Sequence, residues 1–135
     1  MDRRLRAVKA CLALLGLVLG GLAVSAPANA AITTDINDWN LTEAISQAGG
    51  GTQFHISAGG SLVQYRWLDS PNKTTVISGN SCTDYGLLGS ASTYAVGDTS
   101  YHSLFSGYQG QCFVLQGRTG SGQGSMVNHD GRVQR

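Results

Sequence analysis

The apolar residues of this chain follow three successive patterns, and each predicts a different kind of segment. An almost unbroken apolar run occupies residues 11–24. Apolar residues recur at helical spacing within 38–48, and from residue 53 onward they mostly alternate with polar ones. Alternation with a period of two is typical of half-buried β-strands. The chain is therefore predicted to be mainly β, a small antiparallel sandwich or barrel with one short N-terminal helix.

The helix is expected at residues 38–48. Asn40 is a suitable N-cap, and Glu43 stands three residues later, where it completes a capping box. The glycines at 49–51 favour the left-handed backbone that ends a helix. One apolar stripe would face the core, with members at i, i+3, i+4 and i+7: Leu41, Ala44, Ile45 and Ala48.

Strands are expected where β-branched and aromatic residues alternate with polar ones between turn residues. The first three are expected to form a meander of sequential neighbours, because short Gly- or Pro-containing turns separate them. Asp130-Gly131 matches a type I′ turn, which predicts a closing hairpin at the end of the sequence. The predicted strands are residues 53–57, 61–68, 73–78, 94–96, 101–108 and 111–117.

The first thirty residues have the pattern of a secretory signal peptide. Four basic residues precede the apolar run, and the small residues Ala28 and Ala30 follow it. This order of basic start, apolar centre and small-x-small end is that of a cleaved export signal. The run is too short and too rich in glycine for a membrane helix, which needs about 20 apolar residues. We expect cleavage after Ala30, with Ala31 as the next choice, and a single secreted domain at 31–135.

Cleavage would leave two cysteines, Cys82 and Cys112. In a small exported domain two cysteines usually pair. Neither has a second cysteine or histidine at metal-ligand spacing. We therefore predict a Cys82–Cys112 disulfide, no metal site and no cofactor.

The charge of the predicted mature chain argues against two classes of partner. From Ala31 onward there are five Lys or Arg and seven Asp or Glu, a net charge of −2. Proteins that track a phosphate backbone carry a basic surface, so a nucleic-acid partner is not expected. No basic amphipathic helix is present for a membrane surface, and no stable membrane insertion is expected after signal cleavage.

The histidines are the residues from which a catalytic site could be built. A histidine paired with a carboxylate is a common acid–base unit, and His129 is followed directly by Asp130, with Ser125 upstream. Neighbouring residues on a strand point to opposite faces, so His129 and Asp130 are not expected to meet. His102 lies in an aromatic stretch beside Tyr101.

Tyrosines among small polar residues are typical of recognition surfaces. We therefore expect a non-enzymatic extracellular binding or inhibitor module for an unknown protein or glycan. One alternative is a small secreted hydrolase that uses His102 or His129 with an aspartate, and the other is a cell-surface or matrix component. The candidate binding residues are Tyr101, His102, Tyr108, His129 and Asp130.

Overall fold

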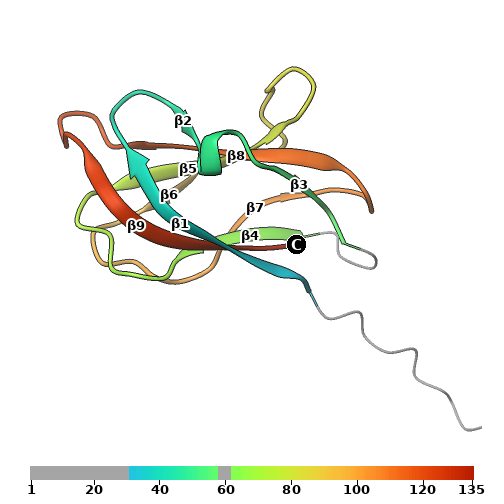
Figure 1. The fold of residues 1–135 in the computed structure, drawn as a ribbon, viewed down its shortest axis with the longest axis horizontal. Coiled ribbons are helices and arrows are strands. Elements are labelled where there is room, and N and C mark those ends of the chain that lie inside the picture. The colour runs from blue at the N-terminus through green and yellow to red at the C-terminus, as the bar shows by residue number, and fades with distance from the viewer. Residues whose placement is uncertain (1–30, 58–61) are drawn as a thin grey trace, which may run out of the picture.

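Two antiparallel sheets packed face to face form the fold in the computed structural model, which describes residues 31–57 and 62–135 (Figure 1). Sheet A has the order β1 (Thr33–Leu41), β9 (Met126–Gln134), β4 (Leu62–Trp67), β7 (His102–Ser106). Sheet B has the order β2 (Ser46–Gln47), β8 (Cys112–Thr119), β5 (Thr75–Ser81), β6 (Ser92–Tyr94), and β3 (Gln53–His55) also pairs with β8. The predicted signal peptide, 1–30, lies outside the described residues.

The mainly β prediction is confirmed, and the core follows from the alternation that predicted it. Along β4 the side chains of Val63, Tyr65 and Trp67 are fully buried, while the residues between them are partly exposed. Such a pattern places every second side chain between the sheets. The largest fully buried side chains include Trp67, Tyr65, Tyr94, Phe113, Leu41, Ile77 and Leu115.

Polar groups of the aromatic core join the two sheets. The Trp67 indole N–H donates to the Thr75 hydroxyl at 2.9 Å, and the Tyr94 hydroxyl donates to the Tyr65 carbonyl at 2.7 Å. Both bonds are buried and both run from one sheet to the other. They satisfy donors that would otherwise be costly to remove from water.

The two sides of the sandwich are closed differently. On one side Ser90 N–H donates to the Leu104 carbonyl at 3.2 Å, which joins the β5–β6 connection to β7. On the other side the Arg135 guanidinium lies over the Phe54 ring at 5.7 Å and donates to the His55 carbonyl at 2.8 Å. Arg135 also donates to the Thr34 hydroxyl, so one side chain ties β1 of sheet A to β3 of sheet B.

The predicted helix at 38–48 is wrong. Residues up to Leu41 continue β1 through a bulge at Asp38, whose φ is 51°. Trp39 and Leu41 pair with β9 and are buried, whereas Ile45, on the predicted apolar stripe, is 65% exposed. Glu43 does not cap a helix; its carboxylate accepts from the Gly124 N–H. Long-range pairing here outweighs local helical spacing.

The predicted hairpin at Asp130-Gly131 is also wrong, because Gly131 lies in the middle of β9. The reason for glycine there is space. A Cβ at Gly131 would collide with the ring and hydroxyl of Tyr65, which packs against the backbone of β9. The predicted meander fails too, since β3 pairs with β8 and β4 pairs with β7 and β9.

The remaining strand predictions agree with the observed elements to within a few residues, although only Tyr94 of 94–96 belongs to β6 and residue 61 is outside the described part. The helical content of residues 31–57 and 62–135 is limited to η1 (Ala48–Gly50), and none of their helical elements is long or apolar enough to cross a membrane.

Candidate functional site

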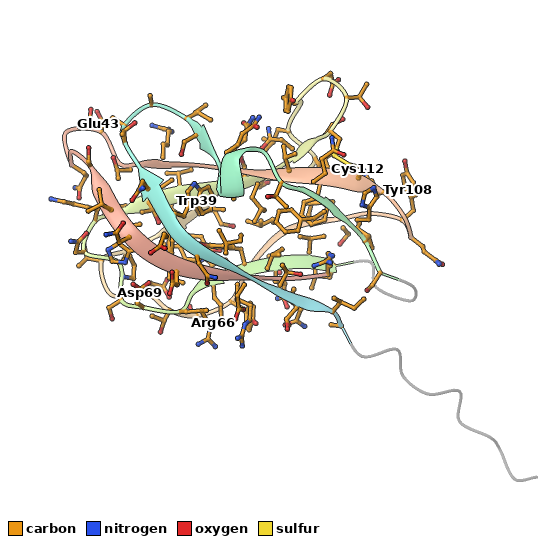
Figure 2. All side chains as sticks on the ribbon, in the orientation of Figure 1. Trp39, Glu43, Arg66, Asp69, Tyr108 and Cys112 are labelled. Atoms are coloured by element: carbon orange, nitrogen blue, oxygen red, sulfur yellow. A yellow bond between two sulfur atoms is a disulfide. The ribbon has the colours of Figure 1, made fainter. Side chains whose placement is uncertain are left out.

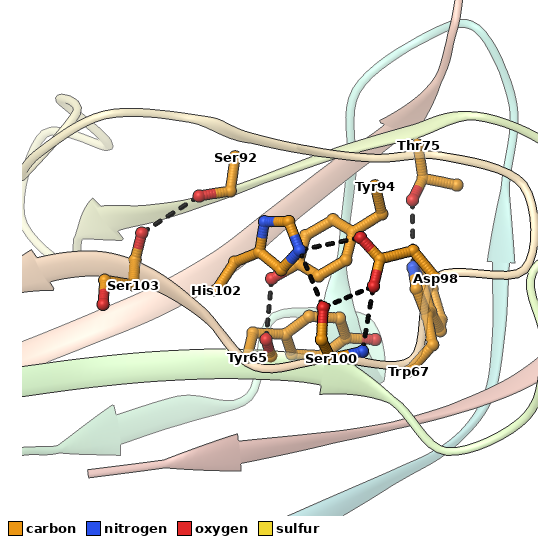
Figure 3. A network of polar contacts seen from close by, with 9 residues as sticks. All are labelled: Tyr65, Trp67, Thr75, Ser92, Tyr94, Asp98, Ser100, His102 and Ser103. Carbon is orange, nitrogen blue, oxygen red and sulfur yellow. Dashed lines mark hydrogen bonds and ion pairs between the residues drawn. The ribbon is translucent and has the colours of Figure 1, made fainter.

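His102 lies in a polar cluster at the start of β7 (Figure 3). Its ring packs on that of Tyr94 with centroids 4.2 Å apart. Its Nε2 is 2.8 Å from Asp98 Oδ2 and 3.3 Å from Ser100 Oγ. The Ser100 hydroxyl is also 2.5 Å from Asp98 Oδ1 and donates to it. A histidine, an aspartate and a serine thus meet at the loop before β7. The side chains of His102 and Asp98 are each about one-quarter exposed.

The arrangement of this cluster differs from that of a catalytic triad. In a triad one ring nitrogen of the histidine faces the serine and the other faces the aspartate. Here both Ser100 and Asp98 contact Nε2, and the serine proton is held by the aspartate. The histidine is therefore not placed to accept that proton. The contacts instead fix the loop that precedes β7.

Asp98 is expected to make the stability of the fold dependent on pH. Donation from the Ser100 hydroxyl is the largest of several effects that lower the pKa of Asp98 below its ordinary value of 3.8. A lowered folded-state pKa contributes stability that is present above the unfolded-state pKa and lost as pH falls through the folded value. Asp98→Asn should therefore be less stable than the wild type at pH 7, and the difference should close below about pH 4.

Urea unfolding of both proteins from pH 7 to pH 2 measures this difference. Ser100→Ala provides a matched variant, because it keeps the carboxylate but removes its main donor. It should show a smaller difference that closes over the same pH range. If the difference in stability between Asp98→Asn and the wild type stayed constant down to pH 2, it would not arise from the charge of Asp98.

His129 and Asp130 point to different partners, as the strand geometry predicts. His129 Nδ1 is 3.2 Å from Asp69 Oδ2, and its ring packs edge-on to Trp67. The Asp130 carboxylate accepts the N–H of Asp38 at 2.9 Å, where β1 bulges. The Asp130 N–H in turn donates to Asp69 at 2.9 Å. The two hydrogen bonds of Asp130 hold the bulge of β1 and the turn after β4 against β9.

Tyr101 is separated from its neighbour His102. The His102 ring meets buried Tyr94, whereas the Tyr101 ring lies against the Arg66 guanidinium at 5.3 Å, on the outer face of sheet A. His102 therefore faces the interior, whereas Tyr101, which directly precedes β7, lies on the outer face of sheet A.

The predicted disulfide between Cys82 and Cys112 is present, with Cα atoms 5.7 Å apart. It joins the residue after β5 to the first residue of β8, and antiparallel pairing of β5 with β8 brings the loop after β5 and the loop before β8 to one end of sheet B. We call these two loops, 82–88 and 107–111, the disulfide end. Figure 2 shows Cys112 and Tyr108 together there, away from Glu43 at the other end.

The disulfide end carries exposed apolar side chains that the sequence analysis found only in part. Tyr108, a predicted binding residue, is 71% exposed; Tyr85 and Leu87, which were not proposed, are 50% and 55% exposed. Tyr85 has a φ of 58°, a left-handed backbone that is rare for a bulky residue. The Asp84-Tyr85-Gly86 triplet has turn composition, but nothing in it identifies which residue takes that conformation.

A cavity of about 130 Å³ lies between β1 and the η1–β3 segment, lined by residues that include Ile36, Gly49 and Phe54. Small-molecule sites usually enclose about 300–1,000 Å³. In the described part of the chain no three His, Cys, Asp or Glu side chains are grouped as metal ligands would be.

Comparisons with protein-family models, with curated proteins and with solved structures find no match to this chain.

Proposed function

We propose that this chain is a secreted, non-enzymatic binding module that recognises a protein partner through its disulfide end. The observation that carries the proposal is Tyr85, a half-exposed aromatic residue held in a left-handed backbone conformation. Such a conformation costs on the order of 1–3 kcal/mol and persists only where its surroundings impose it, often at binding sites.

The loop around Tyr85 is held rigid by hydrogen bonds. The Tyr85 N–H donates to the Ser81 carbonyl at 3.1 Å, and the Asn80 side-chain amide donates to the Tyr85 carbonyl at 2.8 Å. The Gly86 carbonyl accepts from Ser81 N–H at 2.8 Å, which closes the turn. A ring presented by a rigid loop loses little conformational entropy on binding.

The loop that carries Tyr108 is equally constrained. The Gln111 N–H donates to the Tyr108 carbonyl at 3.0 Å, and the Gly110 N–H donates to the Ile56 carbonyl at 2.9 Å. Tyrosines combine a large apolar surface with a polar tip and are enriched at interfaces. Two fixed tyrosines and Leu87 around one disulfide support a recognition surface for a protein.

Secretion is supported by the pattern of residues 1–30 and by the disulfide, which persists mainly outside the reducing cytosol. The hydrolase alternative is weakened by the geometry around His102 and by the hydrogen bond that holds Asp130 to the bulge of β1. The matrix-component alternative predicts that the purified chain associates with itself, which sedimentation would reveal.

The test is capture of a partner by the oxidised protein purified from culture medium, with secreted proteins of the same culture as prey. Tyr85→Gly is the sharpest variant, because it removes the side chain and glycine accepts the left-handed backbone. It should weaken capture at least tenfold without loss of stability, and Tyr85→Gly with Tyr108→Ala should abolish capture. Loss of a hot-spot aromatic typically has an effect of this size.

Ile45→Ala is the control, because Ile45 is also an exposed apolar residue and lies near Glu43 at the other end of the sandwich. It should leave capture unchanged. If Tyr85→Gly retained full capture of the same partner, or if Ile45→Ala reduced it as much, the disulfide end would not be the recognition surface.

A further inference from the structure

The outer face of sheet A carries a row of charged side chains across three strands. In the register of the sheet, Asp35 of β1 lies opposite Arg132 of β9, and Arg132 lies opposite Arg66 of β4. The Tyr101 ring continues the row, since it lies against the Arg66 guanidinium. In Figure 2 Arg66 projects from sheet A away from the interior, on a different side from Tyr108 and Cys112.

This row contains two cations and one anion. The Arg132 guanidinium takes both oxygens of Asp35, through Nε at 2.5 Å and a terminal nitrogen at 2.9 Å. Arg66 makes no ion pair within the described residues, and its buried Nε has no hydrogen-bond acceptor there. Like charges directly opposite on neighbouring strands are destabilising. The row therefore lacks one negative charge beside Arg66.

A second row, two residues further along each strand, is entirely neutral and polar. Gln64 of β4 pairs in register with Gln134 of β9 on one side and with Ser103 of β7 on the other, and Thr33 completes the row on β1. The Gln64 amide donates to the Ser103 hydroxyl at 3.3 Å. Amide and hydroxyl groups of this kind both donate and accept, which suits the hydroxyl groups of a sugar chain.

We propose that this face of sheet A binds an acidic polysaccharide. A carboxylate or sulfate of one sugar is held by Arg66, beside the Arg132–Asp35 pair, and sugar hydroxyls are held by Gln64 and Gln134. The planar guanidinium fork matches either anion with two parallel hydrogen bonds. An open face with one arginine outside an ion pair and a neutral row of amide and hydroxyl groups suits a polysaccharide better than a nucleic acid, which requires many basic contacts. This site does not depend on the disulfide end.

The test uses the full secreted protein and four polymers: polygalacturonate, dextran sulfate, unsubstituted dextran and double-stranded DNA. Affinity electrophoresis and calorimetric titration at low and at physiological salt give the affinities. We expect binding to polygalacturonate or dextran sulfate, and the stronger of the two identifies the anion. Arg66→Gln should weaken this binding at least tenfold. Arg118→Gln, the same charge change at an exposed arginine of sheet B, should leave it unchanged.

Several outcomes would overturn the proposal. They are binding to neither charged polysaccharide, equal binding to plain dextran or to DNA, and equal losses in Arg66→Gln and Arg118→Gln. Chemical shifts of the Gln64 and Gln134 side-chain amides give a second readout, which should move on titration with the bound polymer. Tyr85→Gly should bind the polysaccharide as the wild type does, so failure here and failure of the proposed protein-binding site are distinguishable.

Discussion

Replacing Trp67 by alanine is expected to lower the free energy of unfolding by about 3–5 kcal/mol, the usual range for a fully buried tryptophan. The Trp67 side chain has no exposed surface, and its ring centroid lies 5.2 Å from that of Tyr65 and 5.8 Å from that of Trp39. Truncation would leave a large cavity between these rings and would remove the hydrogen bond to Thr75. A typical domain is stable by only about 5–15 kcal/mol, so the variant should be close to unfolding.

Urea titration followed by tryptophan fluorescence or circular dichroism measures the change. Thr75→Val isolates the hydrogen bond, since it leaves the Trp67 N–H buried without an acceptor; its expected cost is about 1–3 kcal/mol. Val127→Ala, at a 61% exposed residue, should stay within about 0.5 kcal/mol of the wild type. If Trp67→Ala cost no more than Val127→Ala, Trp67 would not be the centre of the core.

Removal of the Cys82–Cys112 disulfide is expected to lower the free energy of unfolding by about 3.5 kcal/mol. The two cysteines are 30 residues apart, and the bridge restricts the unfolded chain by closing that loop. The double variant Cys82→Ser with Cys112→Ser should therefore have a lower urea midpoint and faster amide exchange in the disulfide end. Capture of the proposed protein partner should weaken with it, because Tyr85 and Tyr108 lie on the two loops next to the bridge.

Reduction of the wild-type protein is the matched comparison, because it opens the same loop without changing the sequence. Both treatments should give the same loss within about 1 kcal/mol. If mutation and reduction each lowered the free energy of unfolding by less than about 1 kcal/mol, the hydrogen bonds around Ser81 and Gly110 would be enough to hold the two loops without the bridge.

Much of the strand content could be predicted because apolar residues alternate with polar ones in the sequence and the same apolar residues are buried in the structure. In β4 the residues Val63, Tyr65 and Trp67 are spaced by two and face the same core. The failure at 38–48 has a specific cause. Trp39 and Leu41 are also spaced by two, but their strand, β1, forms only by pairing with β9 (Met126–Gln134), almost ninety residues away. A single sequence does not contain that pairing, and the helical spacing of Leu41, Ala44, Ile45 and Ala48 was coincidental.

Of the candidate-site features, the pairing of Cys82 with Cys112 could be predicted, because only two cysteines follow residue 30 and two cysteines in a small exported domain usually pair. The exposure of Tyr108 does not follow from its residue type, since Tyr65 and Tyr94 are fully buried. The Arg66–Arg132 contact requires the register of β4 against β9, and the meeting of His102 with Asp98 requires the path of a loop. Neither can be derived from spacing along the chain, since both depend on which backbone segments lie side by side.

The position of β9 in sheet A has a consequence for the timing of folding during synthesis. β9 lies between β1 and β4, so β1, the first strand of the described residues, has no partner strand until residues 126–134 follow it. Pairing over such a separation closes a long loop and is slow compared with local structure formation. β1 is thus left without a partner strand while the residues between it and β9 are synthesised. For the proposed secreted protein, this delay would favour passage through a translocation channel before the sandwich closes.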